Sequence, residues 1–127
     1  MLNRVAMKAI VSAPFWFEAA HHSDDYPEGH PNRRIHGHSY RLIVSIEGEV
    51  NPRSGYVIDH DDLVVAMKPL VSELDHNYIN KIPGLEVASS ENIAAWVWKK
   101  LKPQFPGLCR IDIERPSVGM TATYLGN

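Results

Sequence analysis

Residues 36–47 read HGHSYRLIVSIE, and they decide the fold class because polar and apolar side chains alternate along them. One face of an extended chain would carry the apolar side chains and the other the polar ones: Tyr40, Leu42, Val44 and Ile46 against Ser39, Arg41, Ser45 and Glu47. Alternation with a period of two over this length predicts a β-strand with one face in the core.

The segments on both sides of this strand also predict β structure. Residues 6–20 are rich in β-branched and aromatic side chains, which favours a first strand. Residues 23–34 hold two prolines, a glycine and several charges, a composition typical of a loop. On the other side, residues 51–55 read NPRSG and predict a turn, so that 56–58 would begin the return strand of a hairpin.

From Asp59 onward the apolar period becomes helical: Leu63, Met67, Leu70, Val71 and Leu74 recur at helical spacing. Asp61 or Asp62 is placed to cap the start of this helix. Pro69 lies inside the pattern and predicts that the helix is kinked or divided there.

The rest of the chain predicts one more helix and two more strands. Residues 91–101 follow a pair of serines that can cap a helix, and they end in lysines that favour a helix C-terminus. Strands are expected at about 108–114 and 121–125. The order β-β-β-α-α-β-β segregates strands from helices, which indicates the α+β class.

Length and charge exclude several classes of protein. A chain of 127 residues is expected to form a single domain, residues 1–127. Its 13 Lys and Arg against 15 Asp and Glu leave a net charge of −2, without the basic excess of a nucleic-acid-binding protein. No apolar run approaches the ~20 residues that span a membrane, and Lys8 interrupts the N-terminal apolar run of a would-be signal peptide. A single cysteine excludes an internal disulfide, so we expect a cytoplasmic protein.

Histidines are concentrated in one part of the chain, with five of the seven between positions 21 and 38. His36 and His38 are two apart on a predicted strand, so both rings project from the same face. His21, at the end of the preceding strand, could complete a set of three. Catalytic zinc typically takes three protein ligands and leaves a fourth position open. The alternative is that these are ordinary surface or core histidines.

Several motifs carry a resemblance to a known family, in the family's order. They are FEAAH (17–21), PEGH (27–30), HGHSY (36–40), GYVID (55–59), LDHNYIN (74–80), PGLE (83–86), SSENIA (89–94) and Glu114. From about residue 15 to 124 the chain resembles the 6-pyruvoyl-tetrahydropterin synthase family. Within it, the chain is most similar to the bacterial 6-carboxy-tetrahydropterin synthases of the queuosine pathway.

The resemblance implies a tunnelling fold, in which a four-stranded antiparallel sheet carries two helices on one face. A sheet this small has exposed edges and a partly uncovered face. In the family, sheets from several subunits join into a barrel, commonly as a homohexamer built from two trimers, with active sites between subunits. We therefore expect an oligomeric barrel here.

The resemblance also assigns roles to individual residues. His21, His36 and His38 match the Zn²⁺ ligands. Asp75 and His76 match an acid–base pair, in which a carboxylate orients an imidazole. Glu114 matches the anchor of the pterin ring, whose amidine-like edge can donate two parallel hydrogen bonds to a carboxylate. Ser89 and Glu91 belong to a segment that lies near the pterin in the family.

One family position departs from the pattern Cys-x-x-x-His-Gly-His, in which the cysteine is the catalytic base. Asn32 stands at the cysteine position, and an amide does not titrate near neutral pH. The chain's one thiol, Cys109, is interpreted as a small core side chain. Glu28, His30 or His22 could supply a base from the loop, or they could be plain loop residues.

The same loop carries two arginines whose role is open. Arg33 and Arg34 could bind a triphosphate tail, since paired arginines suit phosphate, or they could be solvated loop charges.

These observations leave three hypotheses for a protein that binds a small-molecule pterin. The first is a zinc-dependent lyase that converts 7,8-dihydroneopterin triphosphate to 6-carboxy-tetrahydropterin. The second is a diverged paralogue that cleaves the side chain of a dihydropterin by retro-aldol chemistry. The third is an inactive, metal-loaded pterin-binding protein, since Asn32 replaces the base. A zinc hydrolase of unrelated purpose would explain the histidines but not Glu114 or Asp75–His76.

Overall fold

The computed structural model describes residues 6–127. The prediction that the N-terminal apolar run is not a signal peptide therefore falls partly, at residues 1–5, outside the described residues. The elements are β1 (Lys8–His21), the short 3-10 helix η1 (Pro31–Arg33), β2 (His36–Glu49), α1 (His60–Leu74), β3 (Asn77–Tyr78), the 3-10 helix η2 (Ile79–Lys81), α2 (Ser90–Leu101), β4 (Leu108–Arg115) and β5 (Met120–Tyr124).

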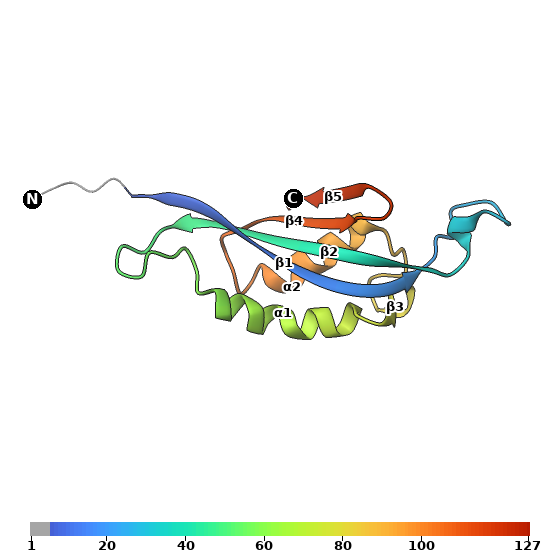
Figure 1. Ribbon diagram of the computed structural model, residues 1–127, viewed down its shortest axis with the longest axis horizontal. Coiled ribbons are helices and arrows are strands. Elements are labelled where there is room, and N and C mark those ends of the chain that lie inside the picture. Colours follow the sequence, from blue (N-terminus) through green and yellow to red (C-terminus); the bar gives the residue numbers. More distant parts are fainter. Residues whose placement is uncertain (1–5) are drawn as a thin grey trace, which may run out of the picture.

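All five strands form one sheet in the order β3-β1-β2-β4-β5 (Figure 1). The four longer strands are antiparallel to their neighbours, as expected, but β3 pairs parallel with β1 through Ala19 and Ala20. The sheet is therefore five-stranded and mixed, and the expectation of a purely antiparallel four-stranded sheet is wrong. A two-residue strand is too short to show a period in sequence, and only the return of the chain from α1 places it beside β1.

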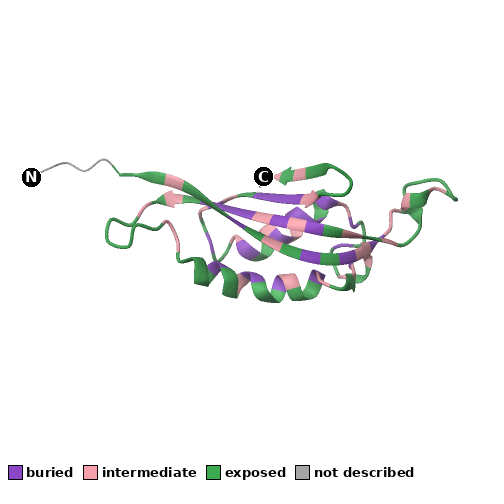
Figure 2. Cartoon of the chain, in the orientation of Figure 1, coloured by how far each residue is buried: buried purple, intermediate pink, exposed green. Residues whose placement is uncertain are grey.

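Both helices lie on the same side of the sheet, so the α+β class is confirmed (Figure 1). The alternation predicted for β2 is observed: Tyr40, Leu42, Val44 and Ile46 are buried. Figure 2 shows the buried residues concentrated between the sheet and the helices. Phe17 of β1 stacks on Tyr40 at 4.7 Å between ring centroids, at the part of the core nearest the histidines.

The predicted hairpin after the turn at 51–55 does not form. Residues 56–58 are not a strand, and the side chains of Val57 and Ile58 pack against the core instead. The edge of β2 that could have received them is taken by β1 and β4 on either side. The apolar pattern of 56–58 therefore reflects burial beneath the sheet rather than strand pairing.

The N-cap of helix α1 lies two or three residues before the cap predicted from the sequence. Asp59 is the N-cap, and its side chain accepts a hydrogen bond from the Asp61 backbone N–H at 2.9 Å. Asp61 and Asp62 lie in the first turn and are not the cap. The helix is not divided at Pro69. The carbonyl that loses its hydrogen bond belongs to Val65, which is 72% exposed, so water can satisfy it.

The remaining predicted elements are confirmed within one or two residues. Helix α2 has Ser89 as its N-cap and two lysines in its last turn. Among residues 6–127, none of the helices has the length and apolar character needed to cross a bilayer.

Candidate metal centre

The pairing of β1 with β2 brings three histidines together at one end of the sheet. In this register His21 lies opposite His36, and His38 lies opposite Ala19. The ring centroids are 4.6 Å apart for His21 and His36, 5.0 Å for His21 and His38, and 4.9 Å for His36 and His38. One ring nitrogen from each residue lies within 4.8 Å of the other two, a spacing that a single metal ion can bridge.

Backbone carbonyls fix the orientation of two of these rings. His21 Nδ1 is 2.7 Å from the Ala88 carbonyl oxygen, and His36 Nδ1 is 2.7 Å from the Arg34 carbonyl oxygen. Because a carbonyl only accepts, each Nδ1 carries the proton and each Nε2 keeps a free lone pair. This arrangement is typical of metal-binding histidines, whose second nitrogen is held by a carbonyl or carboxylate.

The free nitrogens fit a metal. The Nε2 atoms of His21 and His38 are buried and have no hydrogen-bond partner among the described residues. Buried polar atoms without a partner are rare, because each costs the energy of its lost hydration. An ion ligated by the three imidazoles would satisfy them, and three neutral nitrogens with an open fourth position suit zinc.

Burial favours the neutral form of two of the three imidazoles, those of His21 and His38. Burial lowers the pKa of His21. Burial also lowers the pKa of His38 to about 4, and the charges that His21, His36 and Arg115 would carry add to the effect. A metal ion would therefore not have to displace protons from His21 and His38 at neutral pH.

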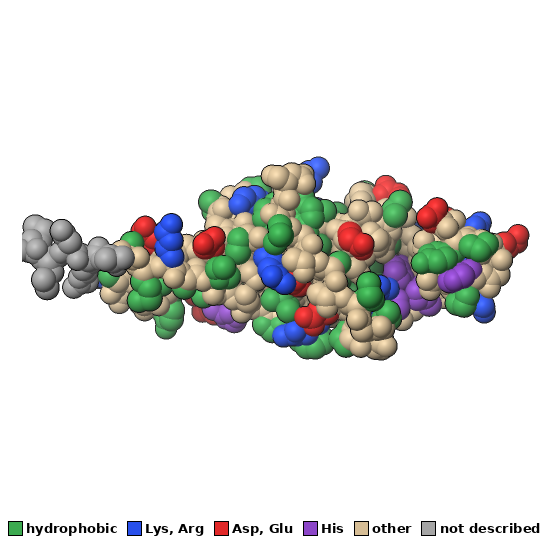
Figure 3. Space-filling model, turned by 90° about the horizontal axis from the view of Figure 1, so that it is seen from above, with side chains coloured by type: hydrophobic (Ala, Val, Ile, Leu, Met, Phe, Trp, Pro, Cys, Tyr) green, Lys and Arg blue, Asp and Glu red, His purple; other side chains and the backbone are tan. Residues whose placement is uncertain are grey.

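The three histidines open into a cavity of about 590 Å³. Figure 3 shows most of the visible histidine atoms gathered toward the right end of the molecule. The loop after β1, the segment before α2 and the end of β4 supply the other walls. Of the sequence-predicted site residues, the cavity brings together His21, His36, His38, Asn32, Ser89 and Glu91.

Asn32 lies in η1 and is held there by its backbone. Its N–H donates to His30 Nδ1 at 3.1 Å, and its carbonyl accepts from the Ser23 N–H at 2.8 Å. Its side-chain amide makes no hydrogen bond within residues 6–127. The position that carries cysteine in the family pattern therefore faces the cavity, with a side chain free of structural ties.

Of the three alternative bases, only His22 lines the cavity. Its Nε2 is 2.9 Å from Asp24 Oδ1, and its Nδ1 contacts the Tyr78 hydroxyl. His30 stacks on Tyr26 at 4.3 Å and accepts the Asn32 N–H, so it supports the loop.

Ser89 and the arginines of the loop also have structural partners. The Ser89 hydroxyl accepts the Asn92 N–H at 3.1 Å and so caps α2. Arg33 donates hydrogen bonds to the carbonyl oxygens of Asp24 and Tyr26 at 3.2 and 2.8 Å, and so it stabilises the conformation of the loop. Arg34 does not line the cavity.

Asp75 and His76 form a pair just after α1, outside this cavity. Asp75 Oδ2 is 2.9 Å from His76 Nδ1, and Asp75 Oδ1 accepts the Glu18 N–H at 2.8 Å. These hydrogen bonds, the one from Glu18 first, lower the pKa of Asp75. His76 has a φ of 57°, which is unfavourable for a non-glycine residue, and its ring is 80% exposed beside a second hollow of about 640 Å³.

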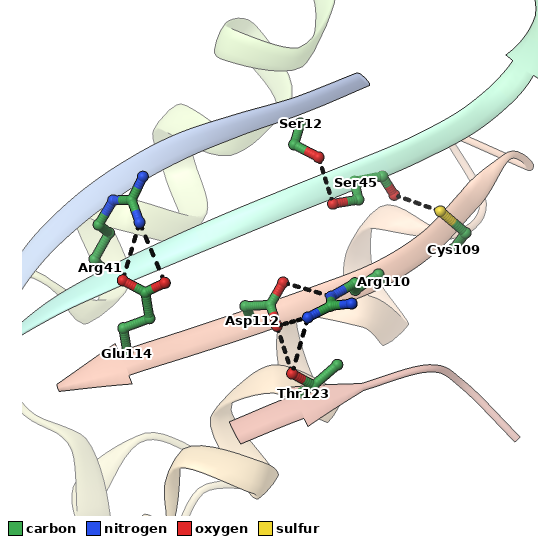
Figure 4. A network of polar contacts seen from close by, with 8 residues as sticks. All are labelled: Ser12, Arg41, Ser45, Cys109, Arg110, Asp112, Glu114 and Thr123. Carbon is green, nitrogen blue, oxygen red and sulfur yellow. Dashed lines mark hydrogen bonds and ion pairs between the residues drawn. The ribbon is translucent and has the colours of Figure 1, made fainter. Parts of the chain in front are cut away.

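Glu114 lies on the sheet face opposite the helices, away from the histidine cavity (Figure 4). Its two carboxylate oxygens are 3.0 and 3.2 Å from Nη1 of Arg41, its neighbour across the β2–β4 pair. One chain alone therefore does not bring Glu114 or Asp75–His76 into the cavity.

Arg115 is a cavity residue that sequence reasoning missed. Consecutive residues on a strand face opposite sides, so Arg115 points to the same side as the buried Ile113. The alternation along 111–115 was the signal that could have identified it.

Comparison with known proteins gives a consistent result. A family model described as 6-pyruvoyl tetrahydropterin synthase matches residues 10–127. The chain is 39% identical over 110 residues to the 6-carboxy-5,6,7,8-tetrahydropterin synthase of Synechocystis sp., covering 82% of this chain and 84% of the relative. It is 35% identical over 103 residues to the dihydroneopterin monophosphate aldolase of Pyrococcus furiosus, covering 80% and 82%.

A solved structure supports the fold. The Caenorhabditis elegans 6-pyruvoyl tetrahydropterin synthase matches with a TM-score of 0.85 at 29% identity, over 98% of this chain and 100% of that one. The tunnelling fold expected for the subunit is thus confirmed.

Proposed function

The chain belongs to the 6-pyruvoyl tetrahydropterin synthase family, and we propose that it is a zinc-dependent lyase that converts 7,8-dihydroneopterin triphosphate to 6-carboxy-tetrahydropterin. This is the reaction of the queuosine and 7-deazapurine pathway. The observation that carries the proposal is the set of three converging imidazoles inside a cavity large enough for a pterin, with the Nε2 atoms of His21 and His38 buried and unpartnered among the described residues. The similarity to a 6-carboxy-tetrahydropterin synthase supports the choice of product.

The three histidines would hold the zinc through Nε2. Bound there, the ion would supply Lewis-acid polarisation of the oxygens on the substrate side chain and so acidify the neighbouring C–H and O–H groups. The cavity walls would exclude water, and the Glu91 carboxylate and Ser89 hydroxyl at the start of α2 offer acceptors for the bicyclic ring.

Asp75 and His76 would move protons in this reaction. Asp75 holds Nδ1 of His76, so that Nε2 is the atom that exchanges a proton with the substrate. Because this pair and Glu114 lie outside the histidine cavity of their own chain, we propose that neighbouring subunits complete each site. A homohexamer formed by two trimers, with the sheets joined into a barrel, would provide this arrangement. We place this enzyme in the cytoplasm.

Asn32 favours a second candidate, retro-aldol cleavage of a dihydropterin side chain. Without a thiol at this position, the base of the first reaction is missing, and the chain is also similar to a dihydroneopterin monophosphate aldolase. In that case His22, which is held by Asp24 and Tyr78 at the cavity wall and is not one of the three proposed zinc ligands, would accept the proton of a side-chain hydroxyl.

Product identification tests these proposals. Zinc-loaded protein is incubated separately with 7,8-dihydroneopterin triphosphate, its monophosphate and 7,8-dihydroneopterin, and the products are identified by mass spectrometry. A 6-carboxy product supports the synthase, and a 6-hydroxymethyl product supports the aldolase. Binding without conversion would leave an inactive pterin-binding protein and contradict both.

A matched pair of variants controls this assay. His36→Ala removes one proposed ligand, whereas His60→Ala removes an exposed histidine at the start of α1. Conversion should be lost in the first and kept in the second. Equal activity in both variants would contradict the proposed site.

A further inference from the structure

Arg115 is the one lysine or arginine among the described residues that line the histidine cavity. It is the last residue of β4 and follows Glu114, which faces the other side of the sheet. It shares this cavity with the three histidines, and its positive charge is among the causes that lower the pKa values of His21 and His38, after burial and neighbouring imidazoles.

The Arg115 guanidinium has no partner in the part of the chain that the structure describes. Its Nε is buried without a hydrogen bond, and no carboxylate oxygen of residues 6–127 lies within 4.0 Å of its nitrogens. Arg41 and Arg110, in contrast, each hold a carboxylate at 2.8–3.2 Å (Figure 4). An arginine with a buried, unsatisfied nitrogen is costly unless an anion meets it.

The acidic side chains of the cavity do not supply that anion. Asp24 contacts His22, and Glu86 accepts the Gly84 N–H at 3.3 Å. Asp25 and Glu91 lie beyond ion-pair distance of Arg115. Guanidinium groups bind phosphate through two parallel hydrogen bonds. A phosphoryl group of a ligand bound beside the three histidines would therefore satisfy Arg115.

We propose that Arg115 forms a phosphate subsite beside the three histidines and binds the phosphoryl group nearest the pterin side chain of the substrate. The subsite rests on the proposed function for the identity of its ligand. It also assigns phosphate recognition to the end of β4 rather than to Arg33, whose guanidinium is occupied by loop carbonyls.

Equilibrium binding tests the subsite without turnover. Metal-free protein is titrated with 7,8-dihydroneopterin 3′-monophosphate and with 7,8-dihydroneopterin, followed by calorimetry. The wild type should bind the phosphate ester about tenfold or more tightly than the alcohol, the factor expected for a charge-assisted pair. Arg115→Gln should remove this preference and leave the affinity for the alcohol unchanged.

Two further variants keep the test decisive. Arg115→Lys keeps the charge but loses the bidentate geometry, so it should retain only part of the preference for the phosphate ester. This variant replaces Arg115→Gln in the test if Arg115→Gln does not fold. Arg53→Gln removes an exposed turn arginine and should leave the preference at the wild-type value. A full preference in a folded Arg115→Gln variant would overturn the proposal.

A pterin-free probe separates this inference from the proposed function. Pyrophosphate binding is followed by ³¹P NMR in the wild type and in Arg115→Gln. If neither pterin binds but pyrophosphate binds in an Arg115-dependent way, the anion subsite holds and the proposed substrate is wrong. If pyrophosphate binding is absent, or is equal in the two proteins, the subsite is wrong.

Discussion

Asn32→Cys is expected to raise turnover, because it places a thiol on the wall of the metal cavity. Only the backbone of this residue is held by hydrogen bonds. Its N–H donates to His30 Nδ1 at 3.1 Å, and its carbonyl oxygen accepts from the Ser23 N–H at 2.8 Å. The side-chain amide makes none within residues 6–127, so the substitution should leave the loop in place.

The size of the gain follows from the role of a general base. A positioned base contributes about 10²–10⁴-fold to a rate, so Asn32→Cys should exceed Asn32→Ser by about a hundredfold or more. Serine is the matched control because it is similar in size but does not titrate near neutral pH. A nearby cation, here the proposed zinc ion, lowers the pKa of a thiol. The rate should therefore rise with pH and level off at a pH below about 8.5, the ordinary pKa of a cysteine thiol.

The assay measures 6-carboxy-tetrahydropterin formation from 7,8-dihydroneopterin triphosphate between pH 6 and 9 in zinc-loaded protein. Cys109 is present in every variant and lies outside the cavity, where burial raises the pKa of its thiol, so it contributes equally throughout. Equal rates in the cysteine and serine variants, at equal zinc content, would refute the reasoning that position 32 faces the reacting atoms.

Three other perturbations test the metal centre and the frame that supports it. Zinc at about a hundred times its Kd should stabilise the fold by about 2.7 kcal/mol. With an unfolding entropy of about 2.1 cal/mol/K per residue over 127 residues, the melting temperature should rise by about 10 °C in calorimetry at fixed protein concentration. His36→Ala should abolish this shift, and an unchanged shift would exclude His36 as a ligand. Leu74→Ala, at the fully buried end of α1, should cost about 2–5 kcal/mol in urea unfolding, and a loss below 1 kcal/mol would contradict its place in the core. Ser89→Ala should cost about 1 kcal/mol through the lost cap of α2, whereas Ser89→Asp should keep most of the stability; equal losses would argue against capping.

The regular strands and helices could be predicted from the sequence because the spacing of their apolar residues follows directly from which face of each element is buried. The alternation of β2 and the helical spacing in α1 correspond to the buried faces that the structure shows. Residues 56–58 carry the same apolar composition as a strand, but their position is decided by which sheet edges are free, and that is a property of the whole sheet. Helix α1 stays continuous through Pro69 because the carbonyl that loses its hydrogen bond belongs to Val65, an exposed residue.

The histidine set was predictable because two of its members are two apart on a strand and the third ends the strand before it. The position of Asp75–His76 was not, since it depends on the length of α1 and on a hydrogen bond to the Glu18 backbone. Cys109 is only half-buried, with its Sγ 3.4 Å from the Ser45 carbonyl oxygen, so its interpretation as a core side chain is wrong. Cys109 lies at a bulge of β4, where the register passes from Ser45 opposite Arg110 to Ile46 opposite Leu108, and so it leaves the alternation that buries its neighbours.

The central claim is that three histidines hold the zinc beside which a pterin is bound. Zinc K-edge X-ray absorption of the loaded protein, recorded before and after addition of 7,8-dihydroneopterin, tests it most directly. We predict three imidazole nitrogens at about 2.0–2.1 Å in both spectra, with a change confined to the remaining oxygen ligand when the pterin is added. A sulfur ligand at about 2.3 Å, which only Cys109 or a methionine could supply, or a spectrum that the pterin leaves unchanged, would contradict the account.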